Sequence, residues 1–289
     1  MKCKYPIKAV AAVWLAVLVI AAMAGCSEKI AGGDQDAGVT VMIDAKPISS
    51  QMINAIDRFE LIVEGRDFGS LNFPMAWEGN FVVARIEIPV GTNRRFSARA
   101  LDKVNVVLYR GETTANVTSR LAAPVDIQLS PAVPMINVTP HYQTGIMNNP
   151  VFTEVNVFNI PDLSELDLEI SMSYGPACVD SVIRGDQLND TIQVGYTIYT
   201  SDCRYCSITV ASAPGNVGRR IVNAAGNAHV ATARFYTYSD WNADSITTLI
   251  SVRPISARLI TGGAFPIDSI YTDGARVFLH RFAAASSPR

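Results

Sequence analysis

The sequence predicts an all-β protein built from two β-sandwich domains. Apolar and polar residues alternate with a period of two from Val39 onward, the pattern of strands with one buried and one solvated face. Pro131 and Pro134 interrupt this pattern, because proline cannot continue a central strand. Beyond residue 25, no long segment has a helical period. These observations predict one sandwich over residues 39–131 and a second over residues 132–282.

Residues 1–25 are organised like a secretory signal peptide. Three lysines, Lys2, Lys4 and Lys8, precede an uncharged stretch that is shorter than the roughly 20 residues of a comfortable membrane span. It ends in Met-Ala-Gly followed by Cys26, which resembles the cleavage box of bacterial lipoproteins. The resemblance implies cleavage before Cys26, lipidation of that cysteine, and a flexible lipidated linker over residues 26–38.

The same segment predicts where the protein resides. Acyl chains on Cys26 would anchor the chain stably to a membrane. In lipoproteins of bacteria with two membranes, an aspartate after the lipidated cysteine favours retention in the inner membrane. Ser27 stands there instead, so the resemblance implies the outer membrane or the cell surface. The alternative is an uncleaved N-terminal anchor helix, and in both cases the domains lie outside the cytoplasmic membrane.

The charge of the mature chain argues against nucleic-acid binding. Removal of residues 1–25 takes away three of the 24 basic residues and no acid, leaving 21 against 26 acidic residues, a net charge of −5. The basic residues are scattered singly, whereas a nucleic-acid-binding surface needs a basic cluster.

Short strands separated by glycine turns are expected in the first domain. The cleanest alternation places Phe96, Ala98 and Ala100 on one face, with arginine and serine residues on the other. Residues 88–102 and 107–111 resemble the Ig-like or prealbumin-like modules of bacterial lipoproteins. That resemblance implies a spacer or adhesive unit.

The second domain contains a strand with clear alternation, in which Leu168, Ile170 and Met172 face one way. Residues 170–182, followed by Gly185-Asp186, resemble the third strand of a cohesin domain and the segment after it. Gly175 stands where that family has an aspartate, so a role of that side chain does not carry over.

Two later segments extend the resemblance. Residues 227–235 are similar to the eighth cohesin strand and residues 272–279 to the last one. The resemblance implies a nine-stranded jelly-roll sandwich over residues 132–282, and residues 283–289 are expected to form a disordered tail.

Three cysteines, Cys178, Cys203 and Cys206, remain in an oxidising compartment once the signal is removed and Cys26 is lipidated. We expect a structural disulfide that joins Cys178 to either Cys203 or Cys206. A redox role for the Cys203-x-x-Cys206 pair would need a helix N-terminus, but the flanking residues read as strands. A zinc site lacks a second paired motif.

The motifs of common enzymes are missing from the sequence, so we expect neither catalysis nor a cofactor. There is no nucleophile elbow, no His-Glu-x-x-His and no glycine-rich phosphate loop. His141, His229 and His280 are isolated from one another and are expected at strand edges or on the surface. Residues 240–244 carry oxygen ligands at alternate positions, yet serines replace the glycine and glutamate that a calcium loop needs. No metal site is therefore predicted.

Candidate binding residues come from two strands. If Ala231, Ala233 and Phe235 face the core, the residues between them face outward and include tyrosine and arginine, which dominate binding hot spots. In cohesins the third and eighth strands lie in the sheet that receives the partner. The resemblance therefore implies one partner-binding face that carries Glu169, Ser171, Ser173, Arg234, Tyr236, Tyr238 and Trp241.

These features favour a lipid-anchored binding or scaffold protein of the cell envelope. The first domain would be a spacer and the second would bind a protein module, for which the family resemblance implies the dockerin type. The alternative is a carbohydrate-binding surface lipoprotein in which Tyr236, Tyr238 and Trp241 stack on a polysaccharide. A purely structural envelope component is a third reading, in which the tyrosines pack against the first domain or a loop.

Overall fold

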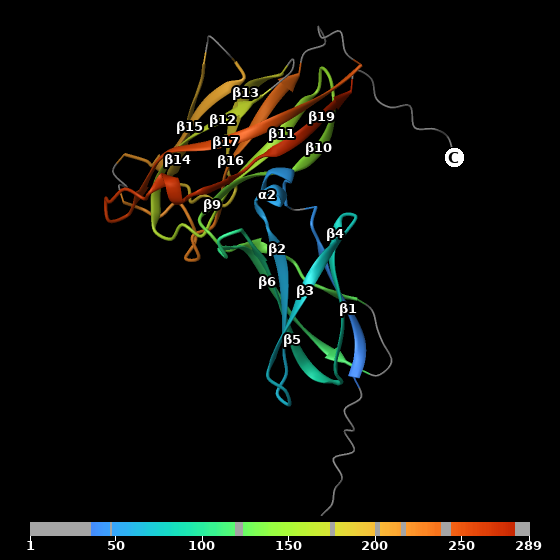
Figure 1. Ribbon diagram of the computed structural model, residues 1–289. Coiled ribbons are helices and arrows are strands. Elements are labelled where there is room, and N and C mark those ends of the chain that lie inside the picture. The colour runs from blue at the N-terminus through green and yellow to red at the C-terminus, as the bar shows by residue number, and fades with distance from the viewer. Residues whose placement is uncertain are drawn as a thin grey trace, which may run out of the picture.

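The computed structural model describes residues 36–46, 48–118, 124–173, 177–199, 203–214, 218–237 and 244–280. In these ranges the chain is almost entirely β-structure, arranged as two sandwiches in succession (Figure 1). The predicted all-β class is confirmed. Within the same ranges, no helix has both the length and the apolar character needed to cross a membrane.

The two ends of the chain carry predictions that mostly fall outside this description. The predicted signal peptide, the lipidated Cys26 and the tail over residues 283–289 lie outside the described residues. The predicted linker over residues 26–38 is too long, because the first strand already begins at Asp36.

The first domain is one eight-stranded sheet that folds back on itself, in the order β7-β1-β4-β3-β2-β5-β6-β8. β3 joins the two halves, since its residues 70–75 pair with β2 and its residues 76–78 pair with β4. Side chains from both halves, such as Val41 and Leu61, enter a single core. The strands are β1 (Asp36–Asp44), β2 (Arg58–Glu64), β3 (Ser70–Glu78), β4 (Phe81–Pro89), β5 (Gly91–Leu101), β6 (Val107–Val117), β7 (Val125–Asp126) and β8 (Ser130–Pro131).

Two local features of this domain were not predicted from the sequence. A short helix, α2 (Ser50–Ala55), begins where the Ser49 side chain accepts a hydrogen bond from the backbone N–H of Met52. Six residues are too few to show a helical period, so the alternation analysis missed it. Between β5 and β6 the chain forms a tight loop, in which the Asp102 carboxylate accepts hydrogen bonds from the backbone N–H groups of Val104 and Val106.

A buried arginine ties two loops of the first domain together. Arg94 is 2% exposed, and its guanidinium pairs with both carboxylate oxygens of Asp67 in the β2–β3 loop. It also donates to the carbonyl oxygens of Pro89 at 3.2 Å and Val90 at 2.6 Å in the β4–β5 turn. Its charge lies 4.7 Å from the ring centre of Phe68. One side chain therefore holds both loops.

Replacing Arg94 with methionine is expected to lower the free energy of unfolding by roughly 2 kcal/mol, because charge-assisted hydrogen bonds are lost at a buried position. The neighbouring Arg95→Met is the matched control. Arg95 is 52% exposed and its ion pairs with Glu64 and Glu112 lie on the surface, so we expect a loss below about 1 kcal/mol. Urea unfolding measures the free energy of unfolding of both variants. Equal losses from the two substitutions would contradict the role of Arg94 in holding the two loops together.

The second domain packs a six-stranded sheet, β10-β19-β17-β12-β15-β14, against a five-stranded sheet, β13-β16-β11-β9-β18. The short β10 and β18 pair in parallel with β19 and β9, which adds to the nine strands that the resemblance implies. The strands are β9 (Met135–Thr139), β10 (Tyr142–Ile146), β11 (Pro150–Phe158), β12 (Leu163–Met172), β13 (Ala177–Arg184), β14 (Ile192–Ile198), β15 (Tyr205–Ser212), β16 (Ala228–Thr237), β17 (Ser245–Leu259), β18 (Tyr271–Asp273) and β19 (Ala275–His280).

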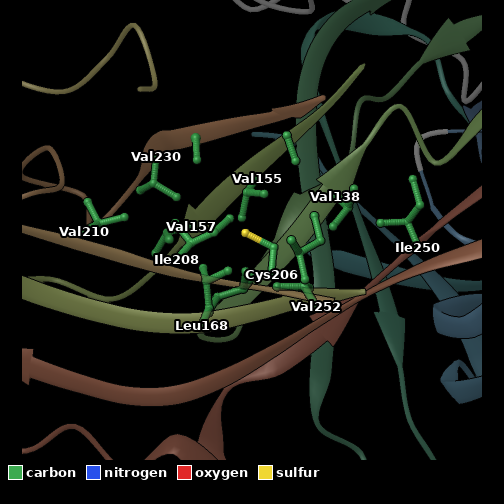
Figure 2. Packing of buried hydrophobic residues seen from close by; sticks show 14 of the residues in the cluster. Val138, Val155, Val157, Leu168, Cys206, Ile208, Val210, Val230, Ile250 and Val252 are labelled. Atoms are coloured by element: carbon green, nitrogen blue, oxygen red, sulfur yellow. The ribbon is translucent and has the colours of Figure 1, made fainter. Parts of the chain in front are cut away.

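The core of the second domain lies between these two sheets. Leu168 from β12, Ile208 from β15 and Val252 from β17 meet Val155, Val157 and Val230 of the opposite sheet, and the sulfur of Cys206 lies among them (Figure 2). Strand residues that face inward are almost completely buried, whereas their neighbours are half-buried or exposed. The alternation in the sequence therefore reports correctly which side of each strand faces the core.

The two domains share an apolar contact. Met135, at the start of β9, has no exposed surface and packs within the core of the first domain. Phe158 and Tyr271 pack against the same cluster from the second domain. Burial of these side chains stabilises the contact between the domains.

A buried carboxylate of the second domain forms hydrogen bonds to the first domain at the same interface. Asp273 is fully buried, accepts a hydrogen bond from the Ser49 hydroxyl, and accepts another from the Tyr109 hydroxyl at 3.0 Å. His141 Nε2 lies 3.7 Å from the Asp273 carboxylate, while His141 Nδ1 is 3.2 Å from the carbonyl oxygen of Gly274. Burial raises the pKa of Asp273, and the neighbouring His141, Ser49 and Tyr109 offset only part of that rise. Burial and the adjacent carboxylate raise the pKa of Tyr109 as well.

Candidate functional site

The predicted binding residues do not form one face. β12 lies in the six-stranded sheet, whereas β16 lies in the five-stranded sheet on the other side of the core. Glu169, Ser171 and Ser173 are therefore separated by the sandwich from Arg234 and Tyr236. The prediction that one sheet presents all of them is wrong, because the neighbours of β12 are β15 and β17.

Both sets nonetheless point away from the core, as the alternation predicts. Glu169 and Ser171 are half-buried between inward-facing Leu168, Ile170 and Met172. Ser173 is exposed, and its hydroxyl accepts a hydrogen bond from the backbone N–H of Leu249 at 3.1 Å.

We call the outer surface of β12, β15 and β17 the β12 face. Cross-strand pairing places Tyr205 beside Ser171, and Arg253 beside Glu169. Its outward side chains are Glu165, Asp167, Glu169, Ser171, Tyr205, Ser207, Thr209, Leu249, Ser251, Arg253, Ile255 and Arg258.

The acidic groups of the β12 face are matched by donors from neighbouring strands. Asp167 accepts hydrogen bonds from the hydroxyls of Thr209 and Ser256, both at 2.7 Å. Arg253 lies 3.4 Å from Glu169, and Arg258 lies 3.7 Å from Glu165. Both arginine side chains are more than 60% exposed, so their remaining N–H groups face solvent.

Exposed apolar side chains flank this polar centre. Leu249 and Ile255 of β17 are 45% and 44% exposed, and Tyr205 of β15 is 38% exposed. Tyr199, 43% exposed, stands beside Tyr205, whose carbonyl oxygen accepts from its backbone N–H at 3.1 Å. Tyrosine and arginine, both exposed on this face, are residue types enriched in the hot spots of protein interfaces.

The outer surface of the five-stranded sheet, which we call the β16 face, holds the other predicted residues. Arg234 is half-buried, and its Nε lies 3.1 Å from a carboxylate oxygen of Asp180. Tyr236 lies between Cys178 of β13 and Pro150 of β11. Phe152 is 47% exposed on the same surface. Tyr238 and Trp241 lie outside the described residues, as does most of the segment 240–244 that was considered as a calcium loop.

A disulfide joins Cys178 to Cys203, with a Cα–Cα distance of 4.8 Å. The sequence left two pairings open, and this one leaves Cys206 as a buried thiol on β15. Cys203 and Cys206 are therefore not a redox pair. Burial raises the pKa of the Cys206 thiol to about 11, so it remains protonated at neutral pH.

Residues that could hold a metal do not gather in the described part of the chain. No group of three or more histidine, cysteine, aspartate or glutamate side chains is placed to bind an ion there. His229 is held by Asp186 at 2.7 Å, and this contact lowers the pKa of Asp186. His141 instead belongs to the interface between the domains.

Sequence reasoning missed two groups of residues. The first is the whole of β17, whose alternation is interrupted at Pro254, where the pairing with β12 shifts register. The second lies between the domains and includes Asp273, Asn137, Trp77 and Tyr142. No local motif marks those residues, because their neighbours in space are distant in the sequence.

No family model matches the chain, and no curated protein matches it. Solved structures similar to it include a non-cellulosomal cohesin from the archaeon Archaeoglobus fulgidus, with a TM-score of 0.39 and 13% identity over 51% of this chain and 91% of that chain. A type I cohesin–dockerin complex from Clostridium thermocellum has a TM-score of 0.41 and 12% identity, over 52% and 97% of the two chains. A type II cohesin from the cellulosome of Acetivibrio cellulolyticus has a TM-score of 0.37 and 11% identity, over 50% and 95%.

Proposed function

We propose that this protein is an envelope binding protein, held to a membrane by lipid on Cys26, whose second domain binds a protein module on the β12 face. One observation carries the proposal: three adjacent strands present exposed arginine, tyrosine and aliphatic side chains around a central acidic strand. The sequence resemblance to cohesins, which led to the expectation of a dockerin-type partner, supports the same strand as the centre of the site.

The chemistry of the β12 face suits a protein partner. Its charges are largely matched within the face, so a partner meets few uncompensated ions that would have to be desolvated. Tyr205, Leu249 and Ile255 offer apolar anchors around this centre. None of the residues of β12, β15 or β17 lines the cavity between the domains, so the β12 face and that cavity are separate surfaces.

The test is a pull-down from envelope and secreted proteins of the producing organism, with residues 27–289 as bait. The whole mature chain is used because the two domains share apolar packing. We expect capture of a specific protein, and at least about tenfold weaker capture by the double variant Tyr205→Ala and Arg253→Glu.

The matched control changes the same residue classes on the opposite sheet, Phe152→Ala with Arg234→Glu, and should capture as the unaltered chain does. Loss of capture by the control alone would place the partner on the β16 face, and no capture by a folded bait would refute protein binding.

The anchor is tested separately by cell fractionation, where Cys26→Ser should move the protein from the membrane to the soluble fraction. Continued membrane association of that variant would contradict lipid anchoring.

A further inference from the structure

A cavity of about 930 Å³ opens between the two domains. Trp77, Ser130 and Pro131 line it from the first domain, and Asn137, Tyr142 and Phe158 line it from the second. Its volume lies in the range of small-ligand sites, which form preferentially where domains meet. We call it the interdomain cleft.

A buried polar atom in the cleft, the side-chain oxygen of Asn137, has no hydrogen-bond partner in the described part of the chain. Ile136 and Val138 point into the core of the second domain, so Asn137 between them faces the first domain. Asn137 is 6% exposed, and its side-chain carbonyl oxygen is buried without a hydrogen bond. Buried acceptors of this kind are almost always satisfied, so this one needs a donor from outside the chain.

Two aromatic side chains on opposite walls keep much of their surface open. Trp77 is 45% exposed, and its ring is held edge-to-face by Phe59 with the ring centres 5.2 Å apart. Tyr142 is 63% exposed on β10. A fixed, exposed aromatic ring is a stacking surface for a ligand with an apolar face.

The remaining polar lining is mostly uncharged. Asn80, Ser130 and Thr139 contribute amide and hydroxyl groups, and none of the described lining residues is aspartate or glutamate. Lys46 adds one exposed positive charge. This lining disfavours a cationic ligand and suits one rich in hydroxyl groups.

We propose that the interdomain cleft binds a saccharide unit. A sugar ring supplies a hydroxyl that donates to Asn137, and its apolar face packs on Trp77 or Tyr142. Further hydroxyls meet Asn80, Ser130 and Thr139. None of the residues of β12, β15 or β17 lines this site, and Tyr236, one of the residues that the sequence suggested for sugar stacking, does not line it either.

The chain offers a direct optical test. Of its three tryptophans, Trp14 lies in the predicted signal, so a Trp241→Phe change leaves Trp77 as the single tryptophan of residues 27–289. Soluble oligosaccharides of cellulose, xylan, mannan, chitin and polygalacturonate are titrated against this protein. We expect a saturable change in Trp77 fluorescence with at least one of them, and at least about tenfold weaker binding after Tyr142→Ala.

Three variants sharpen the result. Asn137→Leu should weaken saccharide binding about as much as Tyr142→Ala does. Circular dichroism and thermal melting check that this variant folds. If it does not, the exposed position of Tyr142 still allows the test. Lys46→Gln separates acidic from neutral sugars, since it weakens only the former. Tyr205→Ala, on the β12 face, should bind as the parent does. No fluorescence response to any of these saccharides, or unchanged binding by Tyr142→Ala, would overturn the proposal.

Discussion

Replacing Asp273 with alanine is expected to lower the free energy of unfolding by about 3 kcal/mol at pH 5. The carboxylate accepts hydrogen bonds from Ser49 and Tyr109 of the first domain. Its removal leaves the Ser49 hydroxyl without this acceptor and the Tyr109 hydroxyl with the weakly accepting sulfur of Met135, at 3.5 Å. Urea unfolding measures the change.

The same residue should make stability depend on pH in a defined direction. Burial raises the pKa of Asp273 above the unfolded value of about 3.9, so the folded protein holds the proton more tightly than the unfolded chain does. The free energy of unfolding therefore falls as pH rises from about 4 through the raised pKa, and the contribution is largest below that window. The effect of the alanine substitution should shrink over the same range.

Asp273→Asn is the matched control, because it keeps the shape and one acceptor oxygen but cannot ionise. The free energies of unfolding of the wild type and Asp273→Asn are compared from pH 4 to pH 8, and their difference gives the contribution of Asp273 ionisation. The comparison is repeated with His141→Gln in both proteins, which removes the neighbouring imidazole. A wild-type protein that gains stability relative to Asp273→Asn as pH rises would refute this assignment.

The second large effect is expected at the disulfide. Cys178 lies on β13 in the five-stranded sheet, and Cys203 stands just before β15 in the six-stranded sheet, so the bond links the two layers. The bonded cysteines are 25 positions apart in the sequence. Closing a loop of that length restricts the unfolded chain by about 3.5 kcal/mol, so Cys178→Ala with Cys203→Ala should lower the free energy of unfolding by roughly 3 kcal/mol.

Mass spectrometry checks the pairing independently. Alkylation of the denatured, unreduced residues 27–289 should label one cysteine, Cys206, and leave the Cys178–Cys203 peptides linked. Cys206→Ala serves as the stability control, because it removes a thiol without opening the loop. A link through Cys206, or an unchanged unfolding midpoint in the double variant, would contradict the structure.

Alternation along the chain was sufficient to predict the fold class and the inward face of most strands. In β12 and β16 the residues expected inside, such as Leu168 and Phe235, are buried, since burial of one face imposes that period. The same pattern does not reveal which sheet a strand joins. β16 was therefore expected in the same sheet as β12, although it belongs to the opposite sheet.

The features between the domains were beyond sequence reasoning for a different reason. Asp273 lies in the segment that resembles the last cohesin strand, yet its partner Ser49 is 224 positions away. Asn137 likewise sits in an apolar strand with no local sign of a cleft. Long-range pairing of this kind depends on how the domains dock, which residue periodicity does not encode.

Because Cys206 is buried, the rate at which a reagent labels its thiol reports how often the second sandwich opens. Its sulfur lies among Leu168, Ile208 and Val252 (Figure 2), and its high pKa leaves almost no thiolate at neutral pH. A thiol reagent therefore reacts with Cys206 only after the two sheets separate. The labelling rate is expected to follow the population of opened molecules. In an oxidising compartment the same delay prevents disulfide exchange with Cys203, three positions away. Burial of the Cys206 sulfur thus protects the Cys178–Cys203 disulfide in the folded protein from exchange.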